Sequence, residues 1–185
     1  MNTIYLGAGG FWTTEAIYRK VKGVEEVLPG YMGGTIPYPT HEAVATGTTG
    51  HAEVVRIVYD PTVIPTEDIL RIFFAMHDAS APNHAINGVG SQYRSVIFYT
   101  DSDQGEAVDP QNGAGVGLIE KLIAEIQQSL PEGVVVATQA VSATEFYPAD
   151  EMHYNYYELN KDSSYVQEAI EPKIQLIAQL FPDKL

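Results

Sequence analysis

Residues 7–20 read GAGGFWTTEAIYRK, in which a turn with three glycines leads into an aromatic pair and then into an amphipathic segment. The residues just before it, 3–8, have the apolar character of a short buried strand. Backbone N–H groups at the start of a helix stabilise negative charge, and α/β proteins often place a reactive group at such a turn. The residue directly before the pair Phe11-Trp12 is Gly10, so the turn has no side chain where chemistry is expected.

The rest of the sequence alternates between strand-like and helical patterns. We expect strands at 51–60, 91–100 and 134–141, and an extended segment at 23–34. We expect helices from Thr13 or Thr14 to about Lys22, from Thr66 to about His77, over the apolar stripe at 116–126, and at 164–180. Long polar loops at 35–50, 79–90 and 101–115 lie between them. Because no linker or internal repeat interrupts this pattern, it predicts a single α/β (α+β) domain over residues 1–185.

The composition argues against several classes of function. Ten basic and 24 acidic residues give a net charge of −14, which repels phosphate backbones and argues against nucleic acid as a partner. The chain has no cysteine, so disulfides, thiolate metal sites and thiol catalysis are excluded for these residues acting alone. The N-terminus lacks the features of a signal peptide, and no apolar run reaches the roughly 18 residues of a membrane span. We therefore expect a cytoplasmic protein with no membrane partner.

The order of the motifs resembles that of the type A peptide methionine sulfoxide reductases. The shared segments are GAGGFW, GYMGG, PYPTHEAV, TGTTGHAEVVRIVYDP, FFAMHD, GSQYRSVIFY and FYPADEMHYNYY. They span roughly residues 3–157, and an ordered set of this kind is more specific than any one short motif. The resemblance implies the α/β roll of that family, built around a ferredoxin-like βαβ core.

In that family a cysteine stands directly before Phe-Trp, and its thiolate attacks the sulfur of the S epimer of methionine sulfoxide. Another cysteine or thioredoxin then resolves the sulfenic acid, and the helix N-terminus favours the reactive thiolate. Here the nucleophile position is Gly10, and no resolving cysteine exists. Because the thiol is also the source of electrons, we expect no intrinsic sulfoxide reduction. Thioredoxin is then doubtful as a partner, and we expect no cofactor.

The resemblance also implies a substrate pocket. Phe11 and Trp12 match the aromatic pair that surrounds the methyl group of the substrate, and aromatic rings suit a methyl–sulfur group. Glu53 matches the acid that hydrogen-bonds to or protonates the sulfoxide oxygen, and Tyr93 matches a tyrosine that donates a hydrogen bond to it. Without the resemblance, the aromatic pair would equally fit a hydrophobic core, and Glu53 an exposed strand end.

Two substrate-binding positions depart from the family pattern. His41 stands where Pro-Thr is usually followed by a tyrosine, and Gly88 stands where the corresponding turn usually has an aspartate. Residues 152–156, MHYNY, replace a segment like YHQDY. These departures accompany the loss of the thiol, and they indicate a relaxed or redirected function rather than one engineered substitution at Gly10.

The histidines raise the question of a bound metal. His51 and Glu53, with His41 or His77 added from a loop, would form a ligand set of the kind that catalytic zinc uses. The sequence has no HExxH pair, however, and the family role of Glu53 accounts for that residue without a metal. We therefore expect no metal.

Three hypotheses remain open. The first is a catalytically silent member that retains a pocket for methionine sulfoxide or a related methyl–sulfur ligand. The second is an enzyme of changed, thiol-independent chemistry that uses Glu53, Tyr93 and His41. The third is a scaffold that binds a protein partner and has an inert pocket. The first two require one open pocket lined by Phe11, Trp12, Glu53 and Tyr93.

Overall fold

The computed structural model describes residues 1–85, 88–100 and 117–185. The predicted loop at 101–115 and the turn residue Asn87 lie outside the described residues. In chain order the elements are β1 (Asn2–Gly7), α1 (Phe11–Tyr18), β2 (Val24–Met32), α2 (His41–Ala45), β3 (Ala52–Tyr59), α3 (Thr66–Met76), β4 (His84–Ala85), β5 (Gly88–Val89), η1 (Ser91–Tyr93), β6 (Val96–Tyr99), α4 (Gly117–Ser129), β7 (Gln139–Ser142), β8 (Tyr147–Pro148), η2 (Glu151–His153), α5 (Tyr156–Leu159), η3 (Val166–Ile170) and α6 (Glu171–Leu180).

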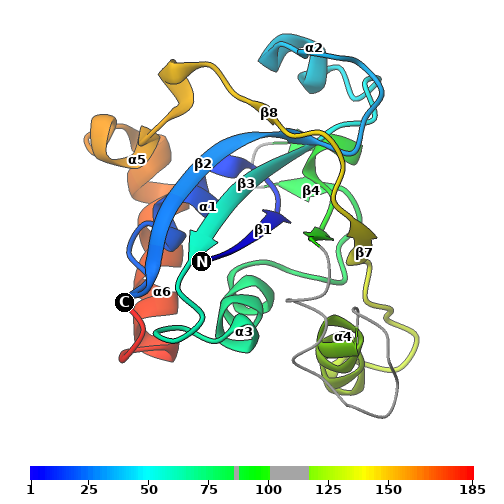
Figure 1. Ribbon diagram of the computed structural model, residues 1–185, viewed down its shortest axis with the longest axis vertical. Helices are drawn as coiled ribbons and strands as arrows, with labels where there is room; N and C mark the ends of the chain where they lie inside the picture. Colours follow the sequence, from blue (N-terminus) through cyan, green and yellow to red (C-terminus); the bar gives the residue numbers. More distant parts are fainter. Residues whose placement is uncertain (86–87, 101–116) are drawn as a thin grey trace.

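The centre of the fold is a sheet with the strand order β7-β6-β1-β3-β2-β8. Strand β3 runs antiparallel to both β1 and β2, and β1 also pairs antiparallel with β6. The chain thus forms two interleaved units, β1-α1-β2 and β3-α3-β6, each split by a strand of the other, which is the ferredoxin-like arrangement. Figure 1 shows β2 and β3 side by side in front of α1. The predicted mixed α/β fold with a ferredoxin-like core is confirmed.

Helices α1, α3 and α6 cover one face of this sheet and enclose the main core. Its fully buried side chains include one from each layer: Ile57 of β3, Ile17 of α1, Phe73 of α3 and Ile177 of α6. A smaller cluster around Met32, Val54 and Phe98 lies apart from it, because successive side chains of a strand point to opposite faces. Burial of each such side chain stabilises the fold by roughly 1.5–3 kcal/mol, and the main core holds α1 against β3.

Helix α1 begins at Phe11, earlier than the predicted Thr13 or Thr14, and ends at Tyr18 rather than near Lys22. Gly10 is its N-cap residue, with extended backbone angles and no side chain to satisfy the first N–H groups. The carboxylate of Glu53, on β3, accepts the Phe11 N–H instead, at 3.1 Å. Sequence reasoning placed the cap wrongly because the capping group comes from a strand that is distant along the chain.

Two predicted loops contain regular structure, and two predicted strands are shorter than expected. The segment 35–50 includes α2, which Thr40 caps by accepting the Ala43 N–H at 3.1 Å, and the segment 79–90 includes the β4–β5 pair. The strand predicted at 91–100 is β6 only from Val96, since η1 precedes it. The strand predicted at 134–141 is β7 from Gln139, parallel to β6.

Residues 134–138 are not a strand because a side chain competes for their backbone. The amide of Gln127, on α4, donates to the Val134 carbonyl at 2.8 Å and accepts the Val136 N–H at 2.9 Å. The final helix is present as predicted, but Val166–Ile170 forms a π-helical turn. Pro172 follows in the first turn of α6, and a widened turn accommodates a residue that lacks an N–H group.

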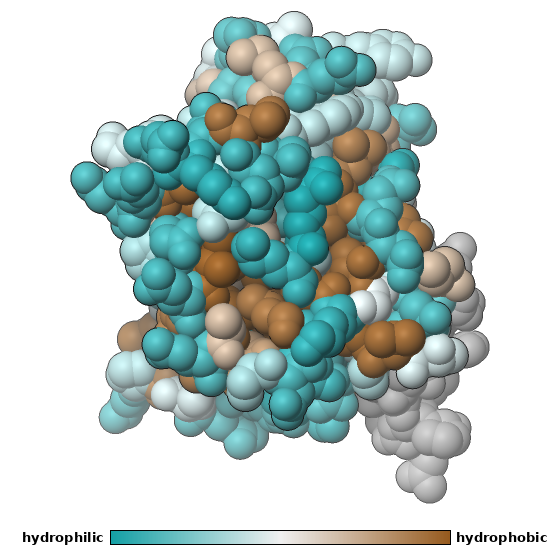
Figure 2. Space-filling view, turned by 90° about the vertical axis from the view of Figure 1, so that its left-hand side faces the viewer, coloured by the Kyte–Doolittle hydropathy of each residue, from teal (hydrophilic) through white to brown (hydrophobic). Residues whose placement is uncertain are grey.

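The surface on one side of the molecule is largely hydrophilic. Figure 2 shows the side of the molecule that carries α5 and α6: hydrophilic residues cover most of it, and hydrophobic ones gather in recesses between them. No helix in the described parts of the chain is both long enough and apolar enough to cross a bilayer.

Candidate functional site

Six of the seven residues singled out from the sequence line one pocket: Gly10, Phe11, Trp12, His41, Glu53 and Tyr93. Tyr165 completes the lining. The walls come from the start of α1, from α2, from β3 and from η1, which the sheet order brings together at one end of the central strands. The pocket has a volume of about 120 Å³, somewhat below the roughly 150 Å³ that accepts a benzene molecule in an engineered cavity. It therefore has room for a group as small as a methyl sulfoxide.

Glu53 is the ionisable group at the base of this pocket. Its side chain is almost completely buried, and an unpaired carboxylate would be costly there. One oxygen, Oε2, accepts the N–H of Phe11 at 3.1 Å, and the other, Oε1, lies 3.4 Å from Nε2 of His41. The carboxylate thus stabilises the start of α1 and pairs with a histidine on α2.

His41 and His153 lie with their rings 4.6 Å apart and share the same electrostatic environment. The hydrogen bond to Glu53 raises the pKa of His41 above its usual value, although burial opposes this. Burial lowers the pKa of His153, and the charge of His41 lowers it further. As the pH falls, His41 is therefore the first of the two to become protonated.

Trp12 forms the aromatic wall and is the only tryptophan of the chain. Its indole stacks on Tyr156 with ring centroids 3.8 Å apart and an interplanar angle of 5°. Its Nε1–H donates to Nδ1 of His153 at 3.3 Å. The ring of His41 is nearly parallel to it at 6.4 Å. Trp12 packs against a distant segment and still lines the pocket, so the first two hypotheses keep the geometry that they require.

We expect the fluorescence of Trp12 to report the protonation of His41. A protonated imidazole beside an indole quenches its emission, so emission should fall as the pH falls, with a midpoint above 6.5. Steady-state fluorescence across pH 5–8 measures this. His41→Asn should remove the transition, and Glu53→Gln should move the midpoint downward. A midpoint below 6.5 in the unmodified protein would assign the transition to His153 instead and contradict the expectation.

Gly10 leaves open space at the start of α1. A Cβ atom built on it would meet only one atom within contact range, Oε2 of Glu53 at 3.8 Å. This is an ordinary van der Waals separation, and the backbone angles of Gly10 (φ −69°, ψ 139°) suit any residue. Neither the fold nor the packing therefore requires a glycine at this position.

The seventh residue, Gly88, lies in β5, where it pairs with Ala85 of β4. It borders residues 86–87, which are outside the described structure, so its part in the site stays a prediction. Sequence reasoning missed three members of the aromatic wall, His153, Tyr156 and Tyr165. The segment 152–156, which departs from the family pattern, contains the first two, but nothing in the sequence pointed to Tyr165.

His51 does not face the pocket as a metal ligand. Its Nδ1 accepts the Gly34 N–H at 3.1 Å, and its Nε2 lies 2.7 Å from the Ile36 carbonyl, so both ring nitrogens fix the loop before α2. In the described residues, no group of three or more histidine or carboxylate side chains is arranged to hold a metal ion. The site thus consists of an aromatic wall, a buried carboxylate, a tyrosine and a histidine. They surround the N-cap residue of α1, Gly10, which has no side chain.

Comparison with known proteins relates this arrangement to one family. A family model described as peptide methionine sulfoxide reductase matches residues 2–185. The chain belongs to the type A peptide methionine sulfoxide reductase family. It is 42% identical over 184 residues to the peptide methionine sulfoxide reductase MsrA of Sulfolobus acidocaldarius, and 41% identical over 185 residues to that of Saccharolobus solfataricus. In both comparisons the match covers 100% of this chain and 97% of the relative.

Solved structures of this peptide methionine sulfoxide reductase family share the fold. Mxr1 of Saccharomyces cerevisiae in its reduced form matches with a TM-score of 0.73 and 29% identity, over 87% of this chain and 86% of that one. Methionine sulfoxide reductase A of Corynebacterium diphtheriae matches with a TM-score of 0.71 and 27% identity, over 86% and 75% of the two chains. Family membership explains the order of the motifs, whereas these 185 residues contain no cysteine.

Proposed function

We propose that this chain binds the S epimer of methionine sulfoxide, or a related methyl–sulfur group, without reducing it. The observation that supports the proposal is the pocket beside Gly10, in which Phe11, Trp12, Glu53 and Tyr93 converge although the chain has no thiol. Reduction of a sulfoxide needs two electrons, and no side chain here supplies them in the way a thiol does.

The lining divides into two halves that suit the two ends of a methyl sulfoxide. The rings of Phe11 and Trp12 offer an apolar wall to the methyl group. Tyr93 faces the polar half, where burial and then the charge of Glu53 raise the pKa of its hydroxyl. That hydroxyl is therefore protonated at neutral pH and can donate to the sulfoxide oxygen. We propose that Tyr93 donates a hydrogen bond to the oxygen, that Glu53 fixes the start of α1 and His41 around it, and that the chirality at sulfur decides which epimer fits.

Titration calorimetry with N-acetylmethionine S-sulfoxide, with the R epimer as the control, tests the proposal. We expect the S epimer to bind more tightly and to change the emission of Trp12, because the ligand would contact the only indole. Tyr93→Phe should weaken binding of the S epimer by roughly two- to tenfold, the effect of one lost hydrogen bond to the sulfoxide oxygen. Binding of neither epimer, or equal binding of both, would contradict the proposal.

A second candidate function is supported by the pairing of His41 with Glu53. Nε2 of His41 lies 3.4 Å from Oε1 of Glu53 in the pocket, and the hydrogen bond to Glu53 raises the pKa of His41. Such a pair could act as an acid and a base in hydrolysis. Assays on esters, thioesters and sulfoxides after dialysis against a chelator test it. Turnover that His41→Asn abolishes would replace the binding proposal with this one.

Independence from thioredoxin and a cytoplasmic location are two further proposals. Mxr1 of Saccharomyces cerevisiae has been solved in complex with Trx2, and it matches this chain with a TM-score of 0.54 at 25% identity. Because the present chain has no thiol to exchange with a thioredoxin, we propose that it acts independently of thioredoxin, in the cytoplasm. If the pocket fails to bind either epimer, the remaining hypothesis is a scaffold that binds a protein partner.

A further inference from the structure

A second cavity adjoins the candidate site on the other side of Gly10. It has a volume of about 240 Å³, and it shares Gly10, Tyr93 and Tyr165 with the smaller pocket. Its other walls are Ala8, Gly9, Thr13, His77, Asp78, Ala81, Ser95 and Lys173. A ligand whose methyl–sulfur end occupies the smaller pocket would therefore have its remaining atoms at the mouth of this larger cavity.

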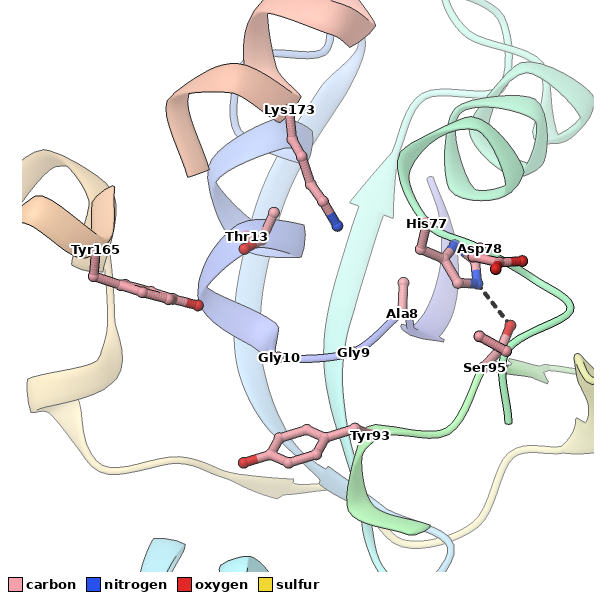
Figure 3. Close-up of a pocket in the computed structure, with 11 residues that line it drawn as sticks. Ala8, Gly9, Gly10, Thr13, His77, Asp78, Tyr93, Ser95, Tyr165 and Lys173 are labelled. Carbon is pink, nitrogen blue, oxygen red and sulfur yellow. Dashed lines mark hydrogen bonds between the residues drawn. The ribbon is translucent and has the colours of Figure 1, made fainter. Parts of the chain in front are cut away.

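Lys173 is the positively charged group of the cavity. Figure 3 shows its side chain extending from α6 into the space between Thr13 and His77. Burial lowers the pKa of its ammonium group, which indicates that the charge is partly withdrawn from water. Within residues 1–85, 88–100 and 117–185, no carboxylate forms a salt bridge with Lys173. A half-buried cation without a counter-ion is unusual in a chain that has 24 acidic residues.

The neighbouring polar groups do not neutralise this charge. Nδ1 of His77 lies 2.7 Å from the Phe73 carbonyl and must donate to it, so Nε2 of the neutral ring accepts the Ser95 hydroxyl at 2.7 Å. Burial lowers the pKa of His77 to about 4, so the ring is uncharged at neutral pH. The Asp78 carboxylate accepts hydrogen bonds from Ser80, and it lies on the far side of the His77 ring from Lys173 in Figure 3.

We infer that this cavity binds a carboxylate, with Lys173 as its counter-ion, and that the ligand is a small methyl–sulfur acid rather than a methionine residue inside a polypeptide. The inference rests on the proposed function, since the sulfur end of the same molecule lies in the smaller pocket. A free amino acid or its N-acyl derivative carries a carboxylate only a few bonds from the sulfur. In the interior of a polypeptide that carboxylate is an amide and gains nothing from a cation.

The test compares two ligands on two proteins by titration calorimetry. The ligands are N-acetylmethionine S-sulfoxide and its N-methylamide, which mimics a residue within a chain. We expect the unmodified protein to prefer the acid by about tenfold, the effect of one charge-assisted hydrogen bond. Lys173→Met should abolish this preference and leave the affinity for the amide unchanged, which also shows that the variant is folded. Lys121→Met, which removes an exposed lysine from α4, is the matched control and should retain the preference.

The outcomes separate the two proposals. If the unmodified protein binds the acid and the amide equally and still selects the S epimer, the carboxylate site is overturned and the proposed function stands. If Lys173→Met and Lys121→Met weaken binding of the acid equally, the effect belongs to the overall charge of the protein and the site is overturned. If neither ligand binds, the proposed function fails, and the inference fails with it.

Discussion

The Gly10→Cys variant is expected to reduce N-acetylmethionine S-sulfoxide slowly in the presence of a small dithiol, whereas the unmodified protein should produce no methionine. In this reaction the oxygen leaves as water and the dithiol becomes a disulfide. The expectation follows from the space at Gly10, where a new Cβ meets only Oε2 of Glu53 at 3.8 Å. The added thiol lies at the N-cap of α1, where the helix lowers its pKa and favours the thiolate.

The restored rate should nevertheless be low. His41 stands where the family pattern has a tyrosine, and Gly88 where it has an aspartate, so we expect the reacting group to lose polar contacts there. Loss of one such donor lowers a rate by roughly 10²- to 10³-fold. We therefore expect turnover at least about 100-fold below that of Mxr1 under the same conditions. A variant as fast as Mxr1 would show that the changes at His41 and Gly88 are harmless.

Two further variants separate chemistry from binding. Gly10→Ser places an oxygen where the thiol would be and should give no reduction, because a hydroxyl does not supply the electrons. Gly10→Cys combined with Glu53→Gln should be slower than Gly10→Cys alone if the Glu53 carboxyl group delivers a proton to the sulfoxide oxygen during the reduction. Equal rates for the double variant and for Gly10→Cys alone would remove Glu53 from that role. Formation of methionine, measured by chromatography, is the readout for all of them.

The sequence predicted the fold well because local patterns and motif order agree there. The β-branched run at 51–60 and the acidic start of the helix at Thr66 both appear as β3 and α3. The errors lie where a distant group replaces a local one. Glu53 caps α1 from another strand, and Gln127 binds the backbone of Val134 and Val136, which would otherwise fit a strand. Glu53 acts across 42 residues and Gln127 across seven and nine, and in both places a side chain outside the segment decides its structure.

The site was predicted from the family motifs rather than from a physical pattern in the sequence. The prediction therefore covers only residues that lie within those motifs. The motifs supplied Gly10, Phe11, Trp12, Glu53 and Tyr93, which line one pocket. They did not supply the second cavity, because its lysine, Lys173, lies on α6, which follows the last of the shared sequence motifs. A lysine on an amphipathic helix predicts an exposed side chain, and only the packing of α6 against α1 turns it toward a cavity.

The stability of the protein is expected to fall in acid because of His77. Its pKa is lowered to about 4 in the folded protein, chiefly by burial, and is near 6.5 when the chain is unfolded. Between these values the unfolded state binds more protons, so the free energy of unfolding decreases as the pH falls from about 6.5 toward 4. A difference of this size in pKa corresponds to roughly 3 kcal/mol, which is a large share of the 5–15 kcal/mol typical of a domain.

Urea unfolding at pH 7 and at pH 4.5 measures the effect, but the many carboxylates also titrate in that range. The comparison is therefore made against His77→Gln, which keeps a polar side chain at the end of α3 and removes the titrating ring. The unmodified protein should lose roughly 2–3 kcal/mol more than the variant between the two pH values. An equal loss would mean that His77 accepts a proton in the folded protein at little cost.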